Sequence, residues 1–306
     1  MFNAEYKERF IIEKNSESII PKGYLEHQFK RVSEMENNLN KDVSNFTYYD
    51  IIEYYKMLNT HSIEYLAVLN SQFSVYTQWC LQQNLVSDGQ NHFLEMRIED
   101  YDKCVNKTLF NLKVIPKSTV LDWVNQLQNP RDQFILLGLF EGIKGNDYCE
   151  LAKLRPEDVK GNTLSLCTGR TFEASDKLIS IIEECIEETI YYSLSGEGKK
   201  TMPLIDRGYV IKDYPNTKDD VSDYQRGRQL YNSIQRIMSF IGVYPKVNSK
   251  QIVESGKLDM IKARANELGI NCTEYLYSKN INEVEEKYDC TIKQKSYIIK
   301  YKNYLE

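Results

Sequence analysis

The residues best suited to bind phosphate are the arginines and lysines of residues 224–264. This segment holds eight basic and two acidic residues, a net charge of +6 within a chain of net charge −5. Neutralised phosphates supply most of the non-specific affinity of a protein for nucleic acid. An ordinary solvated basic surface is the alternative interpretation, and charge patterning alone leaves it open. The basic residues are Arg226, Arg228, Arg236, Lys246, Lys250, Lys257, Lys262 and Arg264.

Helical spacing predicts which of these cations share a face. A helix over 223–241 places Arg236 within roughly 80° of Arg226. Arg226, Arg228 and Arg236 are therefore expected to reach phosphates or, if this helix enters a major groove, guanine edges. Lys250 and Lys257 stand seven residues apart in a second predicted helix over 249–268, so they are expected on one face. There they would contact phosphates and set position more than specificity.

The sequence contains no pattern typical of a metal or cofactor site. Its seven cysteines are odd in number and scattered without a CxxC pair, and its three histidines do not cluster. Such cysteines predict reduced thiols in a cytoplasm rather than disulfides or zinc. The start, MFNAEYKERF, mixes charges without an apolar stretch, and no run of about 18 apolar residues occurs. We expect neither a metal, a cofactor, a secretory signal nor a membrane span.

The elements that would position these residues are mainly helices. The length of 306 residues favours two domains. In the first half, apolar residues at helical spacing predict helices over 22–41, 46–58 and 62–82, with Thr47 as an N-cap. The aromatic stripe of the third helix is interpreted as core. A mixed, polar stretch after Arg97 places a domain boundary at roughly residue 110.

The second half is predicted to combine helices with one small hairpin. Residues 163–167 and 171–174 favour two strands around a turn at Thr168–Arg170. Residues 194–222 are rich in Gly, Asp, Lys and Pro and predict a loop with one or two short strands. The fold class is therefore mainly α with a small β-hairpin or sheet. Helices are expected over 118–127, 130–141, 147–154, 176–192, 223–241, 249–268, 281–288 and 292–304.

One stretch of the second half resembles a known family. The sequence FILLGLFEGIKGNDYCELAKLRPEDV precedes a predicted strand, a Gly-Arg turn, a second strand and an amphipathic helix. This order is similar to the start of the catalytic domain of tyrosine recombinases, the phage integrases. The resemblance covers roughly residues 45 to 304. It implies a helical, SAM-like core-binding domain over 1–110 that clamps DNA, followed by a recombinase-like domain over 111–306.

The departures from the family concern its catalytic residues. In the family a tyrosine attacks a phosphodiester, and arginines, a lysine and His or Trp residues stabilise the transition state. Lys144 stands where the first catalytic arginine is expected, and Arg170 lies near the place of the family's lysine. The second motif, H-x-x-R, aligns Lys250 with its histidine and Val253 with its arginine. No match for the later Gly-His or Gly-Trp pair occurs around Asn280–Glu286.

The resemblance offers several tyrosines for the nucleophile. Tyr297 lies nearest the expected place, and Tyr288, Tyr301 and Tyr304 compete with it. Loss of one positioned donor typically costs about 100- to 1,000-fold in rate. The substitutions therefore predict that the chain is not an enzyme. It is expected to retain the recombinase-like fold without the ability to cleave DNA.

Degenerate recombinase-like proteins of this type serve as repressors in temperate phages, including SPβ-like phages, and the sequence resembles that group. The resemblance implies a sequence-specific repressor that binds a double-stranded operator and maintains lysogeny in the cytoplasm of a bacterial host, at the nucleoid. An active recombinase with a rearranged site, or a recombination accessory protein, is the alternative. The expected DNA-binding residues are Lys144, Arg170, Arg226, Arg228, Arg236, Lys250, Lys257 and Lys262.

The last predicted helix leaves a further alternative open. It is basic and amphipathic, and in the family the C-terminal segment often packs into a neighbouring subunit. The same arrangement would give a homodimer here, whereas packing on its own domain is an equally good interpretation. The sequence does not identify a regulatory partner.

Overall fold

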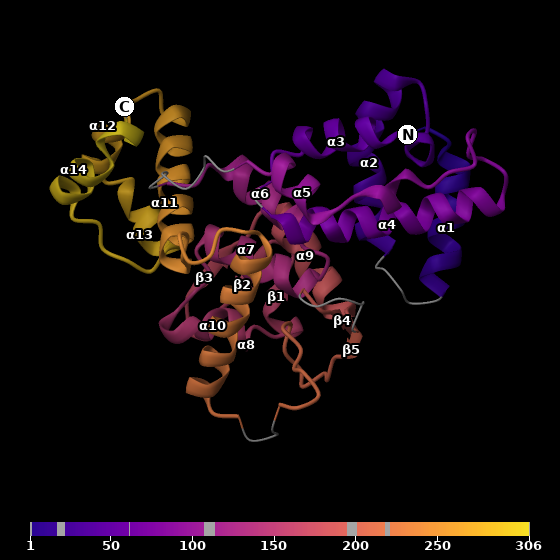
Figure 1. Ribbon diagram of the computed structural model, residues 1–306. Coiled ribbons are helices and arrows are strands. Elements are labelled where there is room, and N and C mark those ends of the chain that lie inside the picture. The colour runs from indigo at the N-terminus through magenta and orange to yellow at the C-terminus, as the bar shows by residue number, and fades with distance from the viewer. Residues whose placement is uncertain are drawn as a thin grey trace. The chain divides into compact units, whose positions relative to one another are not determined.

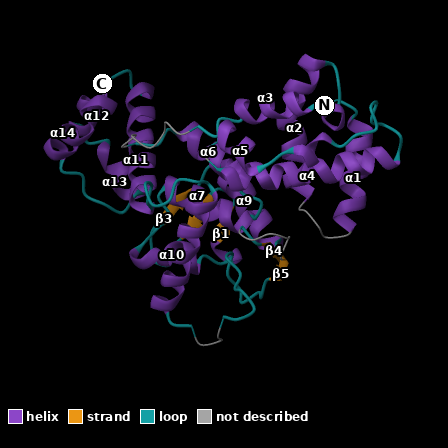
Figure 2. Cartoon of the chain, viewed as in Figure 1, coloured by secondary structure: helices purple, strands orange, loops and turns teal. Residues whose placement is uncertain are grey.

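The computed structural model describes residues 2–16, 22–60, 62–106, 114–194, 201–217 and 221–305. Helices dominate and two small antiparallel sheets accompany them, which confirms the predicted fold class (Figures 1 and 2). The chain divides into two compact units. The N-terminal unit comprises Met1–Phe110 with Phe240–Val243, and the C-terminal unit comprises Asn111–Ser239 with Tyr244–Glu306. The predicted boundary near residue 110 lies outside the described residues.

The N-terminal unit is built from helices that pack around an aromatic core. Thr47 caps one helix, as predicted, because its side chain accepts a hydrogen bond from the backbone of Asp50. Ser62 caps the next in the same way. The sequence did not indicate the first and last of these helices. The elements are α1 (Ala4–Ser16), α2 (Lys22–Leu39), η1 (Val43–Asn45), α3 (Tyr48–Met57), α4 (Ile63–Gln82), η2 (His92–Glu95) and α5 (Ile98–Cys104).

The aromatic stripe of α4 forms the core of this unit, as predicted. Phe73, Tyr76 and Trp79 are buried, and the ring of Tyr76 contacts the rings of Phe10 and Phe29 edge-on. Offset and edge-on contacts of this kind add to the free energy gained by burying the rings. Phe10 belongs to α1, so α1 contributes to the core of this unit.

The C-terminal unit contains most of the helices and both sheets. Its helices are α6 (Lys117–Gln126), α7 (Pro130–Glu141), α8 (Cys149–Lys153), α9 (Asp176–Glu187), α10 (Asp223–Phe240), α11 (Ser249–Glu267), α12 (Cys272–Tyr277), α13 (Ile281–Lys287) and α14 (Gln294–Leu305), with 3-10 turns η4 (Asn146–Tyr148) and η5 (Pro156–Asp158). Among the helices of the described residues, none is long and apolar enough to cross a lipid bilayer.

Helix α7 is the centre of this unit and packs against α6, α9 and α11. Nearly all of its residues are buried, including Phe134 and Phe140. Helix α11 approaches it closely at Gly256, where an added Cβ would lie 1.7 Å from the carbonyl oxygen of Phe140. Only glycine permits this approach. The contact sets the position of the first half of α11 against the end of α7.

The predicted hairpin is present and belongs to a three-stranded antiparallel sheet. Strand β2 (Thr163–Ser165) pairs with β3 (Thr171–Glu173) and with β1 (Val159–Lys160), a strand that the sequence did not indicate. A second sheet pairs β4 (Ile190–Tyr192) with β5 (Thr201–Pro203). The predicted helix over 176–192 was therefore too long. Helix α9 ends at Glu187, and Ile190 faces a strand partner instead of a helical face.

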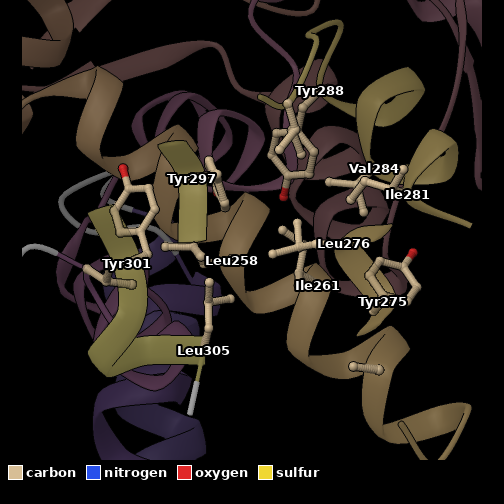
Figure 3. Packing of buried hydrophobic residues seen from close by; sticks show 13 residues of the cluster. Leu258, Ile261, Tyr275, Leu276, Ile281, Val284, Tyr288, Tyr297, Tyr301 and Leu305 are labelled. Atoms are coloured by element: carbon tan, nitrogen blue, oxygen red, sulfur yellow. The ribbon is translucent and has the colours of Figure 1, made fainter. Parts of the chain in front are cut away.

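The final helices form a second apolar cluster within the C-terminal unit. Leu258 and Ile261 of α11 meet Tyr275 and Leu276 of α12, and Tyr297, Tyr301 and Leu305 of α14 complete the cluster (Figure 3). Helix α14 thus packs on its own domain, one of the two arrangements that the sequence left open. A homodimer stays a prediction.

Candidate nucleic-acid interface

The carboxylate of Glu150 organises the site. Its side chain is fully buried at the start of α8. It accepts hydrogen bonds from both the side chain of Arg170 and the hydroxyl of Thr168, and one from the backbone N–H of Lys144. Burial by itself would raise the pKa of Glu150, but the bonds from Arg170 and Thr168 hold that pKa below its ordinary value. Glu150 is therefore an ionised anchor for the three surrounding segments.

Arg170 is a structural clamp at this anchor. Its Nε and Nη2 atoms donate to the two oxygens of Glu150 at 2.7 and 2.6 Å. Nη2 also donates to the carbonyl oxygen of Gly142, and Nη1 donates to those of Glu286 and Lys287. The guanidinium has few donors left for a phosphate. The expectation that Arg170 contacts DNA is wrong for this reason: its N–H donors bind groups within the fold.

Lys144 begins a loop with an unusual backbone that ends at α8. Asp147 and Tyr148 have φ values of +48° and +62°, in the left-handed region. A bulky residue is rarely found there, because its Cβ crowds the following carbonyl. Long-range contacts stabilise the loop: the Tyr148 hydroxyl lies 2.8 Å from the Ser249 hydroxyl, and its ring stacks on that of Tyr231. Tyr148 therefore connects this loop to both α10 and α11.

Three exposed or half-exposed cations lie on the three segments that meet at Tyr148. The ammonium of Lys144 lies 5.9 Å from the Tyr148 ring centroid. Arg228 follows Gly227, whose added Cβ would lie 2.2 Å from the carbonyl oxygen of Asp147, so α10 touches the loop at this point. Lys250 directly follows Ser249. We call the set Lys144, Tyr148, Arg228, Tyr231 and Lys250 the Tyr148 patch.

The arginines of α10 differ in their surroundings. Arg226 pairs with the carboxylate of Asp213 at 3.2 and 3.3 Å, and its guanidinium covers the ring of Tyr209. It is 10% exposed, so the expectation that it reaches phosphates is wrong. Arg228 is exposed. Arg236 is also exposed, with its guanidinium bonded to Ser233 and resting over a tyrosine ring.

The basic residues of α11 do not share one exposed face. Lys250 is exposed, whereas Lys257 is buried and donates to Glu254 at 2.9 Å. The predicted pairing of these two lysines on a DNA-facing surface is therefore wrong. Lys262 is exposed further along the helix, with its ammonium 5.7 Å from the ring of Tyr304. Val253 is partly buried and packs against the apolar cluster of α11–α14.

The candidate nucleophile Tyr297 lies inside that cluster. It is 9% exposed, and its hydroxyl is buried without a hydrogen-bond partner among the described residues. Burial, with further contributions from Glu254 and Tyr301, raises the pKa of Tyr297 far above that of an ordinary phenol.

The competing tyrosines have partners within the fold. Tyr288 donates to the carbonyl oxygen of Phe140, Tyr304 donates to that of Val114, and Tyr301 donates to Glu254. Each of these hydroxyls is therefore used in packing the C-terminal unit. Within the described ranges, no three His, Cys, Asp or Glu side chains are grouped in a way that suits a metal ion.

Several residues of the site had not been singled out from the sequence. Gly145-Asn146-Asp147 carries turn chemistry, which indicates a loop there. The importance of Tyr148 depends on Ser249, which is 101 residues away, and on Tyr231. The sequence predicts scattered thiols, yet Cys149 lies close enough to Cys167 to raise the pKa of Cys167. Contacts across such separations leave no signal in local spacing.

Comparison with known proteins yields matches along most of the chain. Residues 1–82 match the family described as MrpR, N-terminal core-binding domain, and residues 114–305 match MrpR, C-terminal catalytic domain. The chain is 26% identical over 317 residues to the SPbeta prophage-derived uncharacterized protein YopR of Bacillus subtilis (strain 168), which covers 97% of this chain and 94% of that protein. A crystal structure of XerA recombinase aligns over 99% of both chains with 12% identity and a TM-score of 0.38.

Proposed function

The chain belongs to the MrpR family, a tyrosine-recombinase-like family, and on this premise we propose that it is a sequence-specific DNA-binding repressor of a temperate phage. In this proposal residues 1–110 form the core-binding domain that clamps the duplex, and residues 111–306 form a recombinase-like domain that binds the operator without cutting it. The prophage origin of the YopR relative supports a role in lysogeny, in the cytoplasm of the bacterial host.

The observation that carries the proposal is the Tyr148 patch. Its cations Lys144, Arg228 and Lys250 come from a loop and two helices, and none of them forms an ion pair within the described part of the chain. Exposed cations gathered from several elements are what a phosphate backbone requires. By contrast, Arg226, Lys257 and Arg264 are neutralised by carboxylates, so the +6 segment presents less charge to a ligand than its sequence suggests.

The absence of catalysis is also a proposal, and three features support it. Lys144 is a point charge where a bidentate guanidinium is expected. Val253 packs into an apolar cluster and offers no donor. Tyr297 has a buried hydroxyl and a raised pKa, so its nucleophilic phenolate is disfavoured. An incubation with nicked suicide substrates tests this, since a Tyr297-dependent covalent phosphotyrosine adduct would establish an active recombinase instead.

DNA binding is tested with a triple variant of the patch. Lys144→Ala, Arg228→Ala and Lys250→Ala together should weaken binding to duplex DNA, with the slope of log affinity against log salt falling by about one unit per lost phosphate contact. A matched control is Lys160→Ala with Lys177→Ala, two exposed lysines of the same unit in β1 and α9. An unchanged affinity and salt slope in the triple variant, with a normal circular dichroism spectrum, would refute the assignment.

The operator itself is found by sequencing the DNA that the protein retains from the host and phage genomes. We expect a small number of strongly enriched sites, and a dimer would bind them as inverted repeats. Uniform retention of all fragments, with no enriched site, would contradict a repressor and favour an accessory role in recombination.

A further inference from the structure

Two cysteines meet directly beside the Glu150 anchor. Cys149 is the first residue of α8 and follows Tyr148, while Cys167 precedes Thr168 in the turn between β2 and β3. The next residue after each cysteine takes part in one hydrogen bond: the hydroxyl of Thr168 donates to the carboxylate of Glu150 at 2.7 Å. The Cys149 thiol lies close enough to Cys167 to contribute to its raised pKa. Of the seven cysteines, all within the described ranges, Cys167 alone is exposed.

We propose that Cys149 and Cys167 form a peroxide-sensitive pair whose oxidation to an intramolecular disulfide alters the Tyr148 patch. One thiolate attacks a peroxide oxygen, forms a sulfenic acid and releases water after protonation. The second thiol then displaces the sulfenic hydroxyl, which forms the S–S bond and releases a second water. The two thiols lose two electrons and two protons in total, and hydrogen peroxide is reduced to two waters.

The surroundings assign a role to each sulfur. Partial burial, followed by the adjacent Cys149, raises the pKa of Cys167 to about 11. The raised pKa disfavours the thiolate of Cys167, which suits the resolving position. Cys149, which is half-buried, is assigned the first step, the attack on the peroxide.

The disulfide would act on the patch through Gly145. An added Cβ on Gly145 would lie 2.6 Å from the Cys149 sulfur, so this sulfur packs closely against the loop at Gly145. A disulfide requires an S–S distance of about 2.05 Å and imposes a fixed dihedral angle. The Cys149 sulfur must therefore shift, and the loop that carries Lys144 and Tyr148 loses its support. The effect on DNA binding rests on the proposed function, whereas the disulfide does not.

The test uses the full chain treated with hydrogen peroxide in its native state. We expect the mass to fall by two hydrogens, two of the seven thiols to become unreactive to maleimide, and a non-reduced peptide map to contain a Cys149–Cys167 link. Cys149→Ser and Cys167→Ser should each abolish the link. Cys272→Ser, at another half-buried cysteine, is the matched control and should retain it. A peptide map without this link after oxidation would overturn the pair.

A second measurement separates the switch from the function. Binding to a random-sequence duplex at low salt should be lost on oxidation and restored by dithiothreitol, while Cys149→Ser and Cys167→Ser should bind equally in both conditions. A disulfide that forms without a change in affinity would overturn the switch. Failure of the reduced protein to bind any duplex would contradict the proposed function. The pairing of Cys149 with Cys167 would still be decided by the peptide map.

Discussion

The guanidinium of Arg170 holds both carboxylate oxygens of Glu150, at 2.7 and 2.6 Å, while the Glu150 side chain is fully buried. This pair joins the β2–β3 turn to α8, and the remaining donors of Arg170 bind the carbonyl oxygens at the ends of α7 and α13. A residue that the sequence suggested for phosphate binding thus stabilises the framework that carries the exposed cations.

Arg170→Met should therefore act on stability. It leaves Glu150 buried without its main partner, a change that typically costs about 3–5 kcal/mol. Urea denaturation of the variant should show this loss in the free energy of unfolding. Arg170→Met combined with Glu150→Gln should recover part of it, because the buried charge is removed as well. A loss below about 1 kcal/mol in the single variant would contradict a structural role and restore Arg170 as a ligand-binding residue.

Gly227→Ala should disturb the Tyr148 patch. The new methyl group would lie 2.2 Å from the carbonyl oxygen of Asp147, so α10 and the loop must separate. We expect weaker DNA binding by gel shift together with a lower melting temperature. Gly23→Ala is the control, since no atom lies within 4 Å of its added Cβ. Wild-type DNA affinity in Gly227→Ala would indicate that the relative position of α10 and the loop has no part in binding.

Tyr297→Phe should leave DNA binding and repression intact. The substitution removes a buried hydroxyl that has no partner within the described residues, and such a group costs about 1–3 kcal/mol while unsatisfied. The variant is expected to be as stable as the wild type or slightly more stable. Tyr288→Phe is the matched comparison and should be destabilised by about 1 kcal/mol, because it loses its bond to the carbonyl oxygen of Phe140. Loss of repression by well-folded Tyr297→Phe would count against a non-catalytic role.

Glu188 should make stability depend on pH. Burial, followed by the nearby Asp132, raises the pKa of Glu188 to about 8. The folded state therefore favours the neutral acid, so this group's contribution is fully present below its unfolded pKa of about 4.3 and is lost as the pH rises through about 8. Melting temperatures measured from pH 5 to 9 should fall for the wild type and fall less for Glu188→Gln. Glu187→Gln, at the exposed neighbouring position, should follow the wild type. Parallel curves for all three proteins would contradict the shifted pKa.

The sequence by itself determined many of the helices, the hairpin and the aromatic stripe in the core of the N-terminal unit. Thr47 caps α3, the aromatic stripe of α4 is buried, and residues 163–173 form a hairpin, because capping and the alternation of apolar residues are local properties. The end of α9 was missed for a related reason. Ile190 continues the helical spacing, but its pairing with Pro203 in β4–β5 prevails over it, and such pairing depends on a distant segment.

Only the tertiary structure decided which cations remain exposed to a ligand. A count of charges in the sequence treats Arg226, Arg228, Lys250 and Lys257 alike. Arg226 is neutralised by Asp213, and the buried Lys257 is paired with Glu254, whereas Arg228 and Lys250 stay exposed on the helices that contact Tyr148. The physical reason is that ion pairing and desolvation depend on spatial neighbours, and folding brings these together from segments that lie far apart in the chain. The same reason explains the contacts of Tyr148 and the meeting of Cys149 with Cys167.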